Sequence, residues 1–143
     1  MNRTEIRAMN CTIKLEGVDR QVQKEVEQII REFEQNTSRF IPENYLSYLN
    51  NRALNVPILL DETFVELLDQ SLTLARKVDY YVQPFMGDNM RGIGYTSSFH
   101  ENYQPIFEKG KFAIKEFNEE PIERLSDKWL IKKRDFSFDF GGF

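Results

Sequence analysis

The fold is decided by the stretch Asp135-Phe136-Ser137-Phe138-Asp139-Phe140-Gly141-Gly142-Phe143, which holds the clearest strand pattern of the chain. Its three phenylalanines alternate strictly with polar residues, and successive side chains of a strand point to opposite faces of a sheet. The pattern predicts a strand over 136–140 within a sheet, with the phenylalanines packed on helices. Asp139 is expected on the opposite face, toward a cleft lined by Met9 and Tyr81.

Two long amphipathic helices are predicted to cover the apolar face of that sheet. From position 18 to position 33, a spacing of threes and fours places on one stripe Val18, Val22, Val26, Ile29, Ile30 and Phe33. Asp61 is the predicted N-cap of the second helix, whose stripe comprises Phe64, Leu67, Leu68, Leu72, Ala75 and Val78. Between the two, Pro42 suits the first turn of a short helix that carries Tyr45, Leu46 and Leu49.

The remaining segments are predicted to be strands and irregular structure. Residues 5–15 alternate loosely and are predicted to form a strand that ends at 11–15, before a turn at Gly17. Further strands are expected around 111–115 and 129–131. Residues 79–104 are rich in aromatics and glycines and are predicted to be irregular. The order of the elements indicates one α+β domain over residues 1–143, with a mostly antiparallel sheet packed against the two long helices.

Composition excludes several classes of protein. A net charge of −4 gives no general attraction to nucleic acid, and a solvated strand face is the interpretation of the basic cluster Lys128, Lys132, Lys133 and Arg134. One Cys and one His exclude an internal disulfide and a Cys/His zinc cluster. No stretch resembles a secretory signal or approaches the ~20 apolar residues of a membrane span. We therefore expect a cytoplasmic protein without membrane contact.

Four short stretches, in order along the chain, resemble motifs of one enzyme family. They are Ala8-Met9-Asn10-Cys11-Thr12-Ile13; Ser38-Arg39-Phe40-Ile41-Pro42 with Leu46-Ser47-Tyr48-Leu49-Asn50; Val82-Gln83-Pro84-Phe85-Met86-Gly87 with Gly94-Tyr95-Thr96-Ser97-Ser98-Phe99; and Phe138-Asp139-Phe140-Gly141-Gly142-Phe143. Each is weak by itself, but the four in register resemble the amino-terminal half of the ApbE family of flavin transferases. The resemblance implies an incomplete ApbE-like (T-fold-like) domain.

The resemblance also implies an enzyme, an FAD:protein FMN transferase that uses Mg²⁺. Such an enzyme moves FMN from FAD to a Thr hydroxyl of an acceptor protein and releases AMP, so its partners are FAD and a flavin-acceptor protein. No catalytic side chain is carried over to this chain. The residues that match FAD-contacting positions of the family are Met9, Phe40, Tyr81, Val82, Gln83 and Asp139. The carbonyl of Gly142 matches a backbone ligand of Mg²⁺.

The residues at 139–142 agree with a phosphate or metal site but also fit a simpler interpretation. Two glycines let the backbone approach a pyrophosphate or a metal closely, and a helix that followed them would offer its N-terminus to phosphate. In general, an Asp before Gly-Gly is more often a turn former, and Met9, Phe40 and Tyr81 are more often core residues. The joint register of the four stretches favours the site.

The chain is expected to be the flavin-side part of a longer domain. The Lys that follows Gly-Gly in the family motif is not found, nor is the family's second half, which holds the Asp and Thr ligands of Mg²⁺. We therefore predict that the chain alone is inactive, and a second chain that completes the domain remains open as a partner. Two alternatives are a non-catalytic flavin-binding or interaction module and an inactive fragment of the enzyme.

Overall fold

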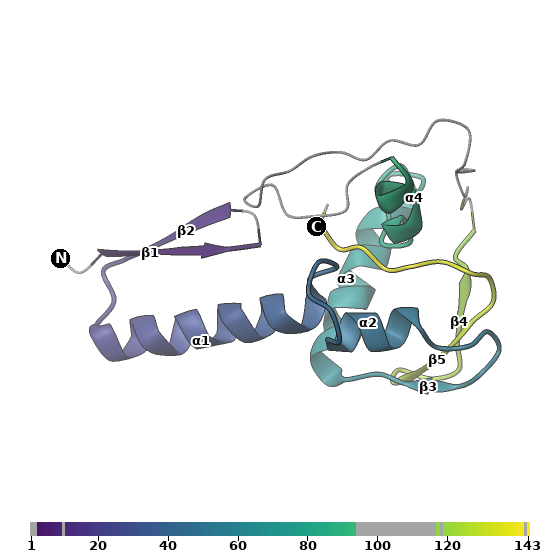
Figure 1. The fold of residues 1–143 in the computed structure, drawn as a ribbon, viewed down its shortest axis with the longest axis horizontal. Coiled ribbons are helices and arrows are strands. Elements are labelled where there is room, and N and C mark those ends of the chain that lie inside the picture. Colours follow the sequence, from purple (N-terminus) through teal and green to yellow (C-terminus); the bar gives the residue numbers. More distant parts are fainter. Residues whose placement is uncertain (1–2, 10, 94–116, 118, 142) are drawn as a thin grey trace.

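The computed structural model describes residues 3–9, 11–93, 117, 119–141 and 143. The elements follow the order β1 (Arg3–Ala8), β2 (Cys11–Glu16), α1 (Arg20–Thr37), α2 (Tyr45–Asn50), β3 (Ile58–Leu59), α3 (Glu62–Lys77), α4 (Gly87–Gly92), β4 (Ile122–Arg124) and β5 (Trp129–Lys132) (Figure 1). In this part of the chain the strands form two small antiparallel sheets, β1-β2 and β3-β5-β4. The predicted α+β class is confirmed, with two small sheets in place of one.

The amino-terminal strands form a hairpin that lies beside α1 (Figure 1). β2 confirms the end of the strand predicted over 5–15, but residues 5–8 belong to a separate strand, β1. The hairpin register pairs Ile6 with Ile13. Gly17 follows β2 at φ +75°, a conformation that glycine adopts without steric penalty. Asp19 then caps α1 by accepting a hydrogen bond from the backbone N–H of Val22. The hairpin and α1 together extend from the rest of the molecule as an arm.

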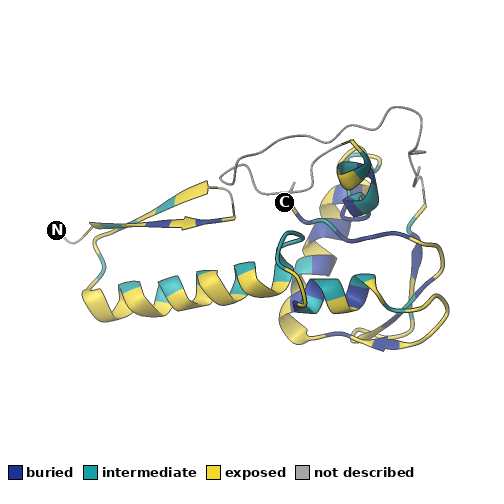
Figure 2. Ribbon diagram, viewed as in Figure 1, coloured by how far each residue is buried: buried dark blue, intermediate teal, exposed yellow. Residues whose placement is uncertain are grey.

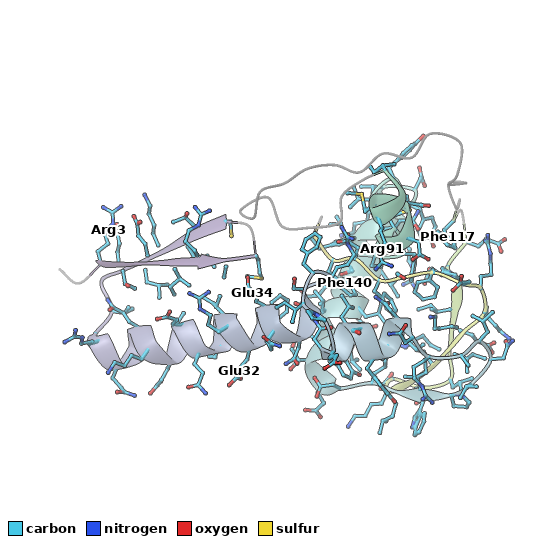
Figure 3. The ribbon with its side chains drawn as sticks, in the orientation of Figure 1. Arg3, Glu32, Glu34, Arg91, Phe117 and Phe140 are labelled. Atoms are coloured by element: carbon cyan, nitrogen blue, oxygen red, sulfur yellow. The ribbon has the colours of Figure 1, made fainter. Side chains whose placement is uncertain are left out.

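The apolar stripe of α1 is not buried, which corrects the sequence prediction. No residue of α1 is buried, and Ile29 is 66% exposed, as the colouring of Figure 2 shows. The helix meets the hairpin through polar groups: Arg31 donates to the carbonyl of Arg7, and the backbone N–H of Met9 donates to Glu34. Figure 3 shows Glu34 on the side of α1 that faces the hairpin. The stripe is covered only in part: Val26, Ile30 and Phe33 are half-buried, whereas Ile29 stays exposed.

Helix α3 follows its prediction closely. Asp61 caps it by accepting a hydrogen bond from the backbone N–H of Thr63 at 3.1 Å. Val78 lies just beyond the helix, and Leu67 is half-buried. The buried residues of the helix are Phe64, Leu68, Ser71, Leu72 and Ala75. The stripe of α3 is therefore the main helical contribution to the core.

Two short helices differ from the sequence prediction. α2 begins at Tyr45 and not at Pro42, because Asn44 caps it by accepting a hydrogen bond from the backbone N–H of Ser47 at 2.8 Å. α4 lies within the segment that was predicted to be irregular. Its two terminal glycines are poor helix formers, and no side chain caps it. Asp88 in its first turn and Arg91 in its last turn suit the helix dipole, but so short a segment shows no apolar periodicity from which to predict a helix.

The segment 135–140 is extended but is not a strand of a sheet, which corrects the central prediction. Its backbone hydrogen bonds go to groups outside the strands: Asp139 N donates to the carbonyl of Pro84, and Gly87 N donates to the carbonyl of Ser137, each at 2.9 Å. A Cβ at Gly87 would lie 2.8 Å from that Ser137 carbonyl oxygen. This close approach therefore requires glycine. Period-two alternation predicts an extended backbone but does not say which groups satisfy its hydrogen bonds.

The three phenylalanines of this segment are buried, as predicted. Phe138 and Phe140 each meet Phe64 of α3 edge-on, with ring centroids 5.4 Å apart. Phe136 meets Phe85 in the same way at 5.2 Å. Edge-to-face aromatic pairs add about 0.5–1.5 kcal/mol beyond the burial of their area. The cluster was expected to pack on both long helices, but within the described residues α1 contributes no buried side chain to it.

One lysine of the basic cluster is buried, which corrects the interpretation of that cluster as a solvated face. Lys132 is 1% exposed, and its Nζ donates to the carbonyls of Asn50 and Arg52 at 3.0 and 3.4 Å. These carbonyls lie at the carboxyl end of α2, where a positive charge is favourable. Asn50 also accepts a hydrogen bond from the backbone N–H of Phe138 at 2.8 Å through its side chain. α2, β5 and the segment 135–140 are thus joined by one polar network.

The remaining predictions are resolved in part. β5 confirms the strand predicted at 129–131. The strand predicted around 111–115 and the motif residues 94–99 lie outside the described residues. Within the part that the structure describes, no helix has the length and apolarity needed to cross a membrane.

Removal of the Phe138 ring should destabilise the fold strongly. We expect Phe138→Ala to lower the free energy of unfolding by about 3–5 kcal/mol, because its site cannot fill the cavity that remains. Phe143→Ala, at a 40% exposed phenylalanine, is the matched control and should cost about 1 kcal/mol or less. Urea unfolding followed by circular dichroism measures both. Equal losses in the two variants would show that the aromatic cluster is not the core.

Candidate functional site

A buried ion pair joins two segments that are far apart in the sequence. Arg39 follows the C-cap of α1, and its Nε lies 2.8 Å from Oδ2 of Asp139. The two side chains are only 4% and 14% exposed. Burial of a charged pair is favourable only where geometry and additional hydrogen bonds are good. The pair therefore fixes the carboxylate of Asp139 relative to the end of α1.

The surroundings of Asp139 hold its carboxylate in one orientation. Its second oxygen, Oδ1, accepts a hydrogen bond from the backbone N–H of Gly141 at 2.8 Å. The guanidinium of Arg39 also lies over the ring of Phe40, 4.5 Å from its centroid. Asp139 is half-buried, whereas Phe138 and Phe140 beside it are buried. Phe40 and Asp139, two residues predicted to contact FAD, are thus brought together through Arg39.

Sequence reasoning did not identify Arg39 as a site residue. Arg39 belongs to the Ser-Arg-Phe motif, but its partner lies 100 positions away. No local pattern predicts a pairing over that distance. The sequence contains one signal for a role of Arg39: it is a charged residue that lies inside a motif and between two helices.

Three further predicted residues follow α3 in a bent turn. Tyr81 is 91% exposed and Val82 is 41% exposed. Gln83 is half-buried, and its Nε2 donates to the carbonyls of Tyr80 and Phe117 at 2.9 and 3.1 Å. Oε1 of Gln83 is buried and has no hydrogen-bond partner among the described residues. The ring of Tyr81 is therefore exposed to solvent, and the side-chain amide of Gln83 attaches the turn to its neighbours.

The base of this turn carries a polar network. Arg76 of α3 pairs with both oxygens of Glu120, at 2.6 and 3.0 Å, and the hydroxyl of Tyr80 donates to Glu120 at 2.8 Å. The hydrogen bond from Arg76 lowers the pKa of the Glu120 carboxyl below its ordinary value. The hydrogen bond to Glu120 raises the pKa of the Tyr80 hydroxyl. Both shifts favour the ionised carboxylate and the neutral phenol that the hydrogen bonds require.

Met9 and Gly142 complete the set of predicted residues. Met9 lies in the turn between β1 and β2 at φ +52° and is 43% exposed. Within the described part of the chain, the backbone hydrogen bonds of Met9 and Tyr81 go to Glu34 and Val78 and not to Asp139. The cleft predicted between them stays a prediction. Gly142, the predicted Mg²⁺ ligand, lies outside the described residues.

An open hollow lies elsewhere, between α1, α2 and the start of α3. Its lining includes Ile29, Phe33, Tyr45 and Phe64. Ile29 and Phe33 belong to the partly exposed stripe of α1, and Tyr45 and Phe64 lie at the edge of the aromatic core. No residue predicted to contact FAD lines this hollow.

The described residues do not by themselves make a metal centre. Among them, no group of three or more His, Cys, Asp or Glu side chains could hold a metal ion. Both oxygens of Asp139 are already engaged, one by Arg39 and one by Gly141. Mg²⁺ prefers six oxygen ligands in near-octahedral geometry. The donor set present here therefore does not fit a complete Mg²⁺ site.

Comparisons with known proteins agree with this fold. The profile of the ApbE family matches residues 8–143. The structure is similar to an ApbE protein from Thermotoga maritima, with a TM-score of 0.76, 12% sequence identity, and coverage of 99% of this chain and 47% of that chain. It is also similar to the apo form of the flavinyl transferase ApbE from Pseudomonas stutzeri, with a TM-score of 0.73, 15% identity, and coverage of 97% and 47%. No curated protein sequence matches the chain.

The chain spans about half the length of these two solved structures. At 12% and 15% identity, the likeness shows the fold and does not transfer the role of any residue. The match extends over nearly all of this chain. Its α1 arm and its aromatic body are therefore both part of the shared fold.

Arg39→Met should destabilise the protein more than the loss of an exposed ion pair does. The carboxylate of Asp139 would keep only the Gly141 N–H in a largely buried position, so we expect a loss of about 2–4 kcal/mol in the free energy of unfolding. Lys128→Met is the control, because Lys128 and Glu62 form an exposed pair at 3.5 Å and its loss should cost under about 1 kcal/mol. Denaturant unfolding measures the free energy of unfolding of both variants. Equal losses in the two would contradict a structural role for the buried pair.

Proposed function

Because this chain belongs to the ApbE family, we propose that it provides the flavin-side half of an FAD:protein FMN transferase. In this reaction the hydroxyl oxygen of an acceptor Thr attacks the flavin-side phosphorus of FAD. The P–O bond to the acceptor forms, the P–O–P bond breaks, the hydroxyl proton passes to water, and AMP leaves. The family match over residues 8–143 is the observation that carries this proposal, and the geometry around Asp139 and Tyr81 supports it.

The exposed turn after α3 is proposed to receive the flavin ring. Tyr81 is 91% exposed, and an aromatic ring in this position offers a flat apolar surface for offset stacking. Val82 is exposed beside it, and the side-chain amide of Gln83 stabilises the turn by donating to the carbonyl of Tyr80. Phe40 carries no hydroxyl, so it would contact FAD through apolar surface alone. Met9, at the tip of the hairpin, is proposed as a further apolar contact.

Asp139 is proposed to accept a hydrogen bond from FAD. An ionised carboxylate has about four acceptor positions, and Arg39 and Gly141 take two of them. The remaining positions can accept an N–H or O–H of the ligand. Because Arg39 and Gly141 already hold the carboxylate, ligand binding need not order it.

A Mg²⁺ ion is proposed from the family resemblance, with the carbonyl of Gly142 as one ligand. When bound, it would neutralise charge that develops on the phosphoryl group. The described residues lack the other ligands, so we draw no step of the reaction through the ion. We expect the other Mg²⁺ ligands to come from the part of the fold that this chain does not include, in the same polypeptide or in a second chain.

The second candidate function is a module that holds flavin or binds a partner protein without catalysing transfer. It is favoured by the described residues, which make no complete metal site. The acceptor protein and the cytoplasmic location remain predictions. The two functions differ in whether a covalent flavin adduct forms.

Asp139→Asn should weaken FAD binding by about tenfold or more, because a hydrogen bond to a charged group is worth about 1.5–3 kcal/mol. FAD fluorescence titration measures the change. Loss of the charge also leaves Arg39 without its carboxylate, so a thermal unfolding curve must show that the variant is folded at the titration temperature. Asp127→Asn, at an exposed carboxylate, is the matched control and should bind like the unmodified chain. Unchanged affinity in folded Asp139→Asn would assign Asp139 to an ordinary turn.

The transfer reaction is tested by incubating the chain with FAD, Mg²⁺ and a flavin-acceptor protein. By itself the chain should give no acceptor with the added mass of FMN, because the described residues hold no complete metal site. Addition of the missing half of the domain should produce that adduct. Turnover by the chain alone would show that the proposed division of the site is wrong. No adduct even with the complete domain would favour the non-catalytic module.

A further inference from the structure

The turn after α3 holds a backbone conformation that its residues do not favour. Asp79 and Tyr80 have φ values of +51° and +62°. The N–H of Tyr80 donates to the carbonyl of Ala75 at 2.8 Å, which is the hydrogen bond of a Schellman C-cap with Asp79 at the left-handed position. Asp tolerates that position. A second left-handed residue is not part of that motif. A bulky Tyr with positive φ is conformationally unfavourable, so other contacts must stabilise it.

The compensation comes from three side chains around Tyr80. Its hydroxyl donates to Glu120 at 2.8 Å, and Glu120 is fixed by a two-point pair with Arg76, one turn earlier on α3. Its carbonyl accepts from Gln83 at 2.9 Å. Both the ring and the peptide of Tyr80 are therefore held. Neither Arg76 nor Glu120 was assigned any role from the sequence.

The conformation of Tyr80 determines where the next residue points. Tyr81 follows directly and is 91% exposed, although a Tyr at the end of a buried helix would ordinarily fold back onto apolar surface. The N–H of Tyr81 donates to the carbonyl of Val78 at 3.0 Å, which closes the turn. The ring of Tyr81 is thus exposed because the backbone of residues 79–81 is fixed in this conformation.

We propose that Arg76, Glu120 and Tyr80 form a clamp that holds residues 79–83 in this bend and so presents Tyr81, already ordered, to an isoalloxazine ring. The ligand named here rests on the proposed function, whereas the clamp itself rests on the contacts above. A loop that is ordered before binding loses less conformational entropy when the ligand arrives. Arg76 and Glu120 are positioning residues, because they act through Tyr80 and do not touch the flavin.

The clamp is tested in the full chain with Glu120→Gln and Tyr80→Phe. Glu120→Gln keeps the shape of the side chain and removes its charge, and Tyr80→Phe removes only the hydroxyl. Asp69→Asn is the matched control, because Asp69 of α3 pairs with Arg124 of β4 at 2.6 Å in the same region. It loses an Arg–carboxylate pair but changes no residue of the turn and leaves the hydrogen bonds of Glu120 with Arg76 and Tyr80 in place.

The first measurement is amide hydrogen exchange, which needs no ligand. The N–H groups of Tyr80 and Tyr81 should exchange about tenfold faster in both clamp variants, because the bend opens more often. They should exchange at the original rate in Asp69→Asn. The double variant Tyr80→Phe/Glu120→Gln should exchange less than the two single effects combined would give, since both changes act on the contact between residues 80 and 120. Exchange that is unchanged, or equally fast in Asp69→Asn, would overturn the clamp.

The second measurement is the quenching of riboflavin fluorescence, which reports stacking of the flavin ring. The clamp variants should bind riboflavin about three- to tenfold more weakly and quench it less at saturation, whereas Asp69→Asn should match the original chain. A general loss of structure lowers affinity without changing the quenching of the complex that remains. Faster exchange with unchanged riboflavin binding would overturn the ligand role of the clamp. Absence of flavin binding by the original chain would instead overturn the proposed function.

Discussion

Edge-to-face packing of Phe138 and Phe140 on Phe64 is the interaction on which the rest of the structure depends. It joins the segment 135–140 to α3 without any sheet between them. The segment then satisfies its backbone on Pro84 and Gly87. Pro84 lies in the connection between α3 and α4, and Gly87 is the first residue of α4. One aromatic cluster thus organises the carboxyl-terminal segment, the helix and the loop after it.

The candidate site follows from this packing. Once alternate side chains of 136–140 are buried, Asp139 must point away from the cluster, where Arg39 meets it. The other part of the site, the turn at Tyr81, begins where the buried stripe of α3 ends. Both parts are therefore attached to the same rigid helix, one through Phe64 and one through its C-cap. A ligand that contacts both would be positioned by α3.

The sequence predicts elements whose determinants are local. The α3 stripe and its Asp61 cap could be predicted, as could the buried face of 136–140, because each depends on spacing within one segment. The pairing of Arg39 with Asp139 could not, since its partners are 100 positions apart. Lys132 was misjudged for the same reason: the carbonyls that bury it belong to α2. The amphipathic pattern of α1 indicates that an apolar partner exists, but it does not show where that partner lies. The residues assigned to FAD by resemblance remain predictions.

The position of Phe136, Phe138 and Phe140 along the chain has a consequence for synthesis on the ribosome. They follow Phe64 by more than seventy residues, so α3 leaves the ribosome long before the rings that cover it. At a translation rate of about 5–20 residues per second, that interval is about 4–15 seconds. During it, the apolar face of α3 is open to chaperones and to neighbouring nascent chains. The order of the segments therefore delays burial of this core until residues 136–140 have been made, and the pace of translation sets how long the apolar face of α3 stays exposed.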